Sequence, residues 1–255
     1  MNKTSLVGIL NVTPDSFSDG GHFERPEAAL GRIVLLREEG ADIVDIGAES
    51  TRPGATPVAA DEEWERLRPV VSALPPGDYS IDTRHGDVAQ KMLKIPHKGM
   101  LWINDVSGFA DPAMVAAVKD SDCRLVVMHS LSVPADKAVV LDESADVLQV
   151  LLDFAGARIE ALTAAGIAKE RIIFDPGLGF GKTAAQSWRI IEEISRLKTL
   201  SVPLLVGHSR KSFLGEDKDA ETLAVSKTLI EQGVDYIRVH DVAAHKSLLG
   251  ICNEH

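Results

Sequence analysis

Eight short apolar runs recur along the chain, and each ends at a polar or charged residue that a turn follows. Between the runs lie stretches whose apolar residues repeat with the period of a helix, most clearly over residues 26–39, 61–73 and 147–164. Strands that alternate with helices build a parallel sheet, and eight such units in 255 residues predict an α/β fold, a (β/α)8 TIM barrel that forms a single domain over residues 1–255. The predicted strands are Leu6–Leu10, Ile43–Ile46, Tyr79–Ile81, Leu101–Ile103, Leu125–Met128, Ile172–Phe174, Leu204–Val206 and Tyr236–Val239.

A turn with three glycines follows the sixth run, over residues 175–183. It matches neither common phosphate loop, because a Walker loop requires glycine where Pro176 stands and a dinucleotide fingerprint requires glycine where Lys182 stands. The alternative fold, a doubly wound open sheet that binds a dinucleotide, would carry such a fingerprint after its first strand, and residues 11–16 do not. The barrel is therefore favoured, and we expect the glycines to let the backbone pass close to a flat ligand.

The charge and composition of the chain exclude several classes of protein. A net charge of -11 argues against a general nucleic-acid binder, which would present a basic face. No apolar run approaches the roughly 20 residues of a membrane span, so no membrane association is predicted. The two cysteines, Cys123 and Cys252, have no metal-type spacing, and two thiols of this kind are typical of a reducing compartment, which predicts a cytoplasmic protein.

The active site of an α/β barrel lies at the carboxyl ends of its strands, and all eight predicted strands end in polar groups. Each such residue has an ordinary structural explanation: an aspartate can cap a helix, and a histidine such as His129 is more often structural than a ligand. The convergence of so many polar groups on one rim favours a binding site. The candidates are Asn11, Arg52, Asp82, Asn104, Met128, Asp175, Phe180, Lys211, Arg238 and His240.

These candidates divide by their chemistry. The carboxylates, the amide and the ammonium of Asp82, Asn104, Asp175 and Lys211 suit the edge of a flat, polar heterocycle, and Met128 and Phe180 can supply apolar walls. Arg52, Arg238 and His240 form a cationic group suited to a phosphate or diphosphate. Asn11 suits a hard cation such as Mg²⁺ that is held mainly by substrate phosphates.

Seven segments, in order and at strand ends, resemble the dihydropteroate synthase family of folate biosynthesis. They are Gly8–Gly21, Ala48–Gly54, Ser80–Thr83, Asn104–Gly108, Asp175–Lys182, Ser209–Ser212 and Ile237–Val242. The resemblance extends over nearly the whole chain and implies the (β/α)8 barrel. It also implies the condensation of 6-hydroxymethyl-7,8-dihydropterin diphosphate with 4-aminobenzoate to give 7,8-dihydropteroate and diphosphate. Mg²⁺ dependence, a homodimer and inhibition by sulfonamides, which mimic aminobenzoate, are further implications.

The resemblance also assigns roles to individual residues. The implied pterin-binding residues are Asp82, Asn104, Asp175 and Lys211, with Met128 and Phe180 lining the pocket. The implied diphosphate-binding residues are Thr51, Arg52, Arg238 and His240, and the implied aminobenzoate surroundings are Phe17, Pro53, Phe180, Lys211 and Ser212. Asn11 is the implied Mg²⁺ ligand. Of these, Asp82, Lys211, Arg238 and His240 are the expected catalytic residues. The expected mechanism is SN1-like and passes through a pterin methylene cation, with residues 13–23 and 50–58 closing over the site.

Two other functions stay open at this point. A methyltransferase that passes a methyl group from methyl-tetrahydrofolate to a corrinoid protein would need the pterin set but not the diphosphate set, so Arg52, Arg238 and His240 favour the synthase. A non-catalytic pterin-binding paralogue would tolerate the loss of Asn11, Thr51 or Lys211, and all three are present.

Overall fold

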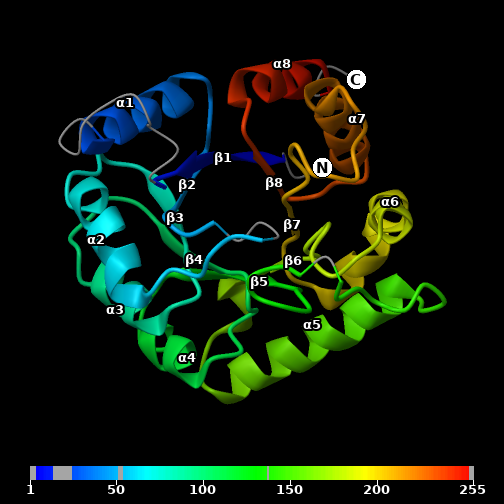
Figure 1. Cartoon of the computed structure of the whole chain (residues 1–255), viewed down its shortest axis with the longest axis horizontal. Coiled ribbons are helices and arrows are strands. Elements are labelled where there is room, and N and C mark those ends of the chain that lie inside the picture. The colour runs from blue at the N-terminus through cyan, green and yellow to red at the C-terminus, as the bar shows by residue number, and fades with distance from the viewer. Residues whose placement is uncertain (1–3, 14–24, 51–53, 137, 253–255) are drawn as a thin grey trace.

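A computed structural model describes residues 4–13, 25–50, 54–136 and 138–252. Eight parallel strands lie in the order β6-β5-β4-β3-β2-β1-β8-β7, and a bridge between Phe174 and Leu204 joins the two edges, so that the sheet closes into a barrel. The helices surround this barrel on the outside (Figure 1). The predicted (β/α)8 fold is therefore confirmed, and the open doubly wound sheet is wrong.

The observed elements follow the predicted ones closely. The strands are β1 (Ser5–Asn11), β2 (Ile43–Gly47), β3 (Asp78–Asp82), β4 (Leu101–Asp105), β5 (Arg124–Met128), β6 (Ile172–Asp175), β7 (Leu205–Val206) and β8 (Tyr236–Val239). The helices are α1 (Arg25–Glu38), α2 (Ala60–Val71), α3 (Gly86–Leu93), α4 (Pro112–Val118), α5 (Val147–Ala164), α6 (Ala184–Glu192), α7 (Lys218–Glu231) and α8 (Val242–Cys252), with 3₁₀ turns η2 (Lys169–Arg171) and η3 (Ile194–Leu200). The short β7 is the main difference, because Leu204 makes only an isolated bridge to β6.

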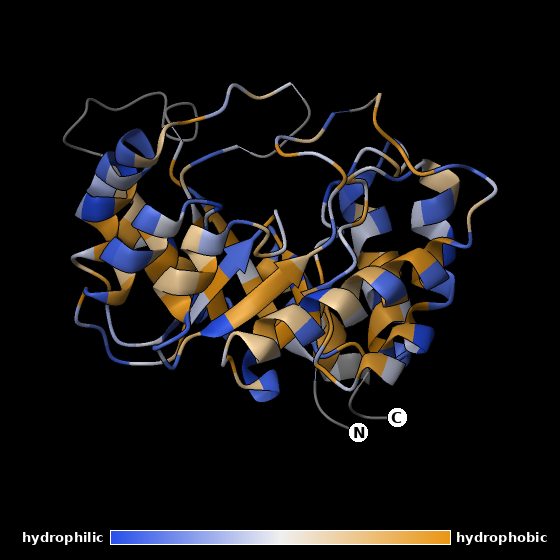
Figure 2. Ribbon diagram, turned by 90° about the horizontal axis from the view of Figure 1, so that it is seen from below, coloured by the Kyte–Doolittle hydropathy of each residue, from blue (hydrophilic) through white to orange (hydrophobic). Residues whose placement is uncertain are grey.

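Two apolar layers stabilise the barrel. The larger one lies between the strands and the surrounding helices, where side chains such as Leu6, Ile33 and Phe174 are buried. Figure 2 shows that hydrophobic residues concentrate in the strands and that polar residues lie along the outer ribbons. In the part of the chain that the structure describes, no helix is both long and apolar enough to cross a membrane.

The smaller apolar layer fills the inside of the barrel. It consists of Val7, Ile43, Trp102, Val126, Ile173 and Leu205, with Tyr236 packed against them. At the amino-terminal ends of the strands the Tyr236 ring meets Trp102 edge to face at 4.9 Å, and Arg124 Nη1 donates to the Tyr236 hydroxyl at 2.9 Å. These side chains plug that end of the barrel.

The period of the strands places polar residues directly above this apolar layer. Side chains two positions apart on a strand point to the same face. Inward-facing Ile43, Trp102, Ile173 and Tyr236 are therefore followed on the same face by polar residues, which are Asp45, Asn104, Asp175 and Arg238. The alternation of the strands thus builds a polar chamber at the carboxyl ends.

Candidate active site

A cleft opens at the carboxyl ends of the strands and has a wide outer part and a narrow inner part. The outer cavity has a volume of about 530 Å³, and the inner cavity measures about 30 Å³. The two belong to one cleft because they share the wall residues Asp82, Phe180, Gly207, Lys211 and Arg238.

The inner cavity brings together all six residues that the sequence assigned to a flat heterocycle. Its walls include Asp82, Asn104, Met128, Asp175, Phe180 and Lys211, which come from β3, β4, β5, β6 and the loops after β6 and β7. Val106, Gly177, Gly207 and Arg238 complete the walls. Apolar surfaces thus flank a floor of carboxylates and amide, which is the arrangement that binds a polar ring by its edge.

An ion-pair network crosses the floor of the cleft. Arg238 Nε donates to Asp45 Oδ2 at 2.5 Å, and Arg238 Nη2 donates to Asp82 Oδ2 at 2.9 Å. The Asp45 side chain is 1% exposed, and its second oxygen, Oδ1, has no hydrogen-bond partner among the described residues. Arg238 therefore lies between two carboxylates from neighbouring strands, and its position depends on both.

Burial tunes the two carboxyl groups of the inner cavity. Burial raises the pKa of Asp82 to about 7, although Arg238 opposes the rise and Asp45 adds to it. Burial also raises the pKa of Asp175, against a hydrogen bond of 2.7 Å from the Gly177 N–H to Asp175 Oδ1. For Arg238, burial opposes the charged form, but Asp45 and Asp82 outweigh it and the pKa of Arg238 is raised. The guanidinium is therefore a permanent cation in the cleft.

The glycine-rich turn after β6 forms one wall of the cleft. Gly177 has a φ of +64°, and a Cβ at that position would lie 2.1 Å from the His129 carbonyl oxygen, so only glycine fits. The turn carries Phe180, whose ring centroid lies 4.1 Å from Lys211 Nζ. This cation–π contact connects the loops after β6 and β7 across the mouth of the inner cavity.

The outer cavity is rich in cationic and hydrogen-bonding groups. Ser212, Arg238 and His240, which the sequence singled out, line it together with Ser209, Arg210 and Lys218, which it did not assign. Ser209 Oγ and His240 Nδ1 share a hydrogen bond of 2.8 Å, which fixes the imidazole. With Lys211, the cavity lining holds four Arg and Lys side chains, which suit an anionic group with several oxygens.

Asn11 lies at the end of β1 and lines the outer cavity. Within the described ranges, no cluster of three or more His, Cys, Asp or Glu side chains could hold a metal ion by itself. One amide oxygen beside a cationic, phosphate-sized cavity fits a hard cation that takes its remaining oxygens from substrate and water. Phe17, Thr51, Arg52 and Pro53 lie outside the residues that the structure describes.

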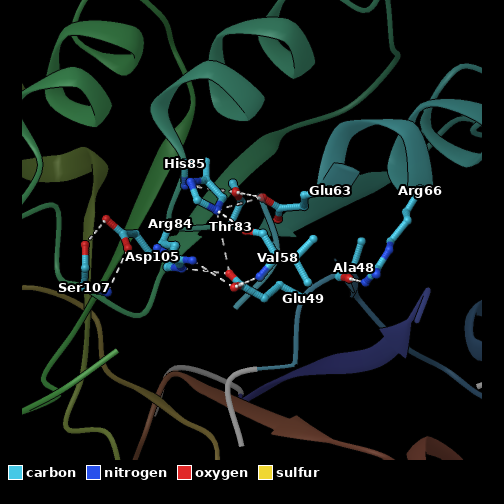
Figure 3. A network of polar contacts seen from close by, with 10 residues as sticks. All are labelled: Ala48, Glu49, Val58, Glu63, Arg66, Thr83, Arg84, His85, Asp105 and Ser107. Carbon is cyan, nitrogen blue, oxygen red and sulfur yellow. Dashed lines mark hydrogen bonds and ion pairs between the residues drawn. The ribbon is translucent and has the colours of Figure 1, made fainter. Parts of the chain in front are cut away.

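A second polar network holds the wall formed by the loops after β2 and β3 (Figure 3). Glu49 lines the outer cavity, and its carboxylate accepts from Arg84 Nε at 2.8 Å, from Arg84 Nη2 at 2.9 Å and from the Val58 N–H at 2.8 Å. His85 Nε2 donates to the Val58 carbonyl at 3.0 Å. The N–H and the carbonyl of Val58 are therefore both held by hydrogen bonds. The Glu49 side chain, at the other end of the stretch from residue 49 to residue 58, is held by Arg84.

A buried carboxyl group lies beneath this network. Glu63 is fully buried, accepts a hydrogen bond of 2.9 Å from Thr83 Oγ1 and leaves its other oxygen without a partner among the described residues. Burial raises the pKa of Glu63 to about 8. The group is therefore protonated at neutral pH and adds no second negative charge beside Glu49.

Sequence reasoning missed three features of the cleft. Asp45 is one of them, and its signal was an acid inside an otherwise apolar strand, two residues after inward-facing Ile43. Glu49 stood at a strand end without a role. Gly207 gave no signal, but a Cβ there would lie 3.7 Å from Asp175 Oδ2 and 3.8 Å from Arg238 Cδ, so its missing side chain keeps the inner cavity open.

Comparison with known proteins gives consistent matches. Residues 7–240 match the sequence model of a family described as pterin binding enzyme. A probable bifunctional folylpolyglutamate synthase/dihydropteroate synthase of Halobacterium salinarum is 40% identical over 94% of this chain, which spans only 30% of that protein. The dihydropteroate synthase of Synechocystis sp. is 38% identical over 95% of this chain and 86% of its own length. The structure of Xanthomonas albilineans dihydropteroate synthase with 4-aminobenzoic acid superposes with a TM-score of 0.88 at 37% identity, covering 99% of this chain and 93% of that one.

Asp45→Asn is expected to destabilise the protein by about 3 kcal/mol, because it removes one of the two carboxylates that compensate a largely buried guanidinium. Urea unfolding at neutral pH measures this loss. The matched control is Asp219→Asn, which breaks the exposed pair with Arg210 and should cost less than about 1 kcal/mol. Equal losses in the two variants would contradict the role given to Asp45.

Glu63→Gln is expected to flatten the pH dependence of stability. The folded-state pKa of about 8 lies above the ordinary value of 4.5 that the unfolded chain retains, so wild type loses stability as pH rises between these values. The glutamine variant lacks this titration and should gain about 2 to 4 kcal/mol relative to wild type between pH 5 and pH 8. Denaturant unfolding across this range tests the expectation, with the exposed Glu62→Gln as a control whose difference from wild type stays constant.

Proposed function

The chain belongs to the family of pterin-binding enzymes, and we propose that it condenses 6-hydroxymethyl-7,8-dihydropterin diphosphate with 4-aminobenzoate to give 7,8-dihydropteroate and diphosphate. The observation that carries the proposal is the position of Asp82. It lies where the narrow, edge-binding inner cavity meets the wide cationic outer cavity. A pterin ring that enters the inner cavity by one edge and extends into the outer cavity would place its exocyclic methylene carbon near this carboxylate and direct the diphosphate outward.

The inner cavity binds and orients the ring. Asp175 and Asn104 offer hydrogen-bond acceptors to ring N–H and amino groups, and Lys211 donates to a ring oxygen or nitrogen. Met128 and Phe180 cover the faces of the ring. The Arg238 guanidinium reaches both cavities, and His240 and Ser209 lie on the outer side, where they stabilise the diphosphate as it leaves.

The reaction then runs in two bond changes. The methylene C–O bond breaks early, its electron pair leaves with the diphosphate, and the positive charge spreads over the pterin. Asp82 stabilises this cation in its ionised form. The arylamine nitrogen of 4-aminobenzoate donates its lone pair to the methylene carbon, and the resulting C–N bond is completed when the nitrogen loses a proton to solvent. An electrophile this reactive compensates for the weak nucleophilicity of an arylamine.

Asn11 would hold Mg²⁺ together with the oxygens of the substrate diphosphate, and the ion would supply charge neutralisation of the leaving group. The proposed surroundings of the aminobenzoate remain Phe17, Pro53, Phe180, Lys211 and Ser212. Thr51 and Arg52 remain proposed diphosphate ligands. Sulfonamides would compete at the aminobenzoate surroundings. The free, buried thiol of Cys123 suits a reducing cytoplasm, and a homodimer rests on the family resemblance alone.

The other candidate functions have less support. A corrinoid methyltransferase needs no cationic outer cavity, whereas this cleft has one. The Synechocystis relative and the Xanthomonas albilineans structure named above are dihydropteroate synthases, and the Halobacterium relative is a probable bifunctional folylpolyglutamate synthase/dihydropteroate synthase, which favours the synthase.

The purified protein is expected to release diphosphate only when dihydropterin diphosphate, 4-aminobenzoate and Mg²⁺ are all present. A coupled diphosphate assay with chromatographic detection of dihydropteroate measures both products. Omission of each component in turn is the control. Diphosphate release that does not depend on 4-aminobenzoate, or no release at all, would refute the proposed function.

Lys211→Ala is expected to weaken binding of the pterin ring by about 10- to 150-fold, because it removes a charged donor worth about 1.5–3 kcal/mol. Calorimetry with 6-hydroxymethyl-7,8-dihydropterin measures the affinity. Lys218→Ala is the matched control, since Lys218 lines the outer cavity but not the inner one. Its loss should leave the affinity for the ring unchanged. An unchanged affinity in Lys211→Ala would contradict the placement of the ring.

A further inference from the structure

A buried lysine lies behind the wall of the inner cavity. Lys182 is 6% exposed, and burial lowers its pKa to about 7, against the nearby Asp175 carboxylate. Its Nζ donates to the carbonyl oxygens of Phe180, Gly177 and His129 at 2.9, 3.0 and 3.4 Å and to His129 Nδ1 at 2.8 Å. The described walls of the two cavities do not include Lys182. It therefore contacts the cleft only through the groups it holds.

The contacts of Lys182 connect the residue that follows β5 to the turn that follows β6. His129 follows β5, and its backbone N–H donates to the Asp175 carbonyl at 3.0 Å. Its ring nitrogen Nδ1 accepts a hydrogen bond from Lys182 Nζ. Burial, with Lys182 close by, lowers the pKa of His129 to about 3, so the imidazole is neutral and its Nδ1 lone pair is available as an acceptor. His129 is thus a structural group that anchors the lysine, as the ordinary interpretation of its position suggested.

The same ammonium determines the path of the glycine-rich turn. Gly177 O accepts both from Lys182 and from the Phe180 N–H at 3.0 Å, and the Gly177 N–H in turn holds Asp175 Oδ1. Two carbonyls of the turn consequently point away from the cleft and toward Lys182. Asp175 and Phe180, together with Gly177, are the residues of this stretch that line the inner cavity.

We propose that Lys182 is a positioning residue for the pterin ring, which it serves by holding the turn at 177–180 in the conformation that presents Asp175 and Phe180 to the ligand. This inference rests on the proposed function for the identity of the ligand. Without Lys182 Nζ, the Phe180 carbonyl and His129 Nδ1 lose this donor, and the Gly177 carbonyl keeps only the Phe180 N–H. The turn then rearranges to find other partners. The rearrangement displaces groups that contact the ring, although no atom of Lys182 touches it.

Lys182→Met tests the proposal because methionine keeps most of the side-chain length and removes the donor. The KM for dihydropterin diphosphate is expected to rise at least about tenfold while kcat stays within about threefold, since ring placement is lost but the leaving-group contacts remain. Lys182→Gln keeps one donor group and should give an intermediate KM. It also serves as the folded variant if the methionine protein does not fold.

Arg171→Met is the matched control. Arg171 lies at the opposite end of β6 and also holds three backbone carbonyls, those of Val118, Lys119 and Cys123, at 2.8, 3.1 and 2.8 Å. Its loss should lower the melting temperature and leave the KM for the pterin substrate unchanged. An unchanged KM in both Lys182 variants, or an equal rise in Arg171→Met, would overturn the proposal.

Binding without turnover separates this inference from the proposed function. Calorimetry with 6-hydroxymethyl-7,8-dihydropterin should show the same weakening in Lys182→Met as the KM does. If wild type binds the ring but forms no product, the proposed reaction fails while the role of Lys182 is still measured. If wild type forms product and Lys182→Met binds the ring as tightly as wild type, only the role of Lys182 fails.

Discussion

The cleft depends on one arginine that is held between two acids. Arg238 projects from β8 into the barrel and is compensated by Asp45 on β2 and Asp82 on β3, so three strands contribute to a single charge cluster. A guanidinium placed there without both carboxylates would pay the desolvation cost of a charge in a poorly hydrated interior. The cluster therefore ties substrate chemistry to barrel stability: the groups that stabilise the leaving anion and the cation are also those that neutralise one another before substrate arrives.

The opposite wall uses a different device. There the backbone turn after β6 is fixed from behind by the buried ammonium of Lys182 and from the front by the cation–π contact between Lys211 and Phe180. Positive φ at Gly177 allows the turn to pass within contact distance of the His129 carbonyl. Two lysines, one buried and one half-buried, thus define one wall, and neither could take the place of the other.

Much of this arrangement could be predicted from the sequence. Strand ends can be predicted because an apolar run that stops at a polar residue marks both the strand and its carboxyl end. This pattern assigned Asp82, Asn104, Asp175 and Lys211 to one cavity, and all four line it. Groups inside the barrel were harder to find: Asp45 looks like an interruption of an apolar strand until register shows that it faces Arg238. Lys182 lies within a recognisable motif, but nothing in a linear sequence shows that its side chain turns away from the ligand. Gly207 acts by lacking a side chain, and residue type alone does not reveal an unfilled space.

The fixed ends of the segment between Glu49 and Val58 affect how the protein can change over evolutionary time. Glu49, Arg84 and His85 hold the first and last residues of this segment by hydrogen bonds to a side chain and to both backbone groups of Val58. The three side chains are therefore constrained together. A change at Glu49, Arg84 or His85 removes a support of the cleft wall that the other two do not replace, so these positions cannot vary independently of one another.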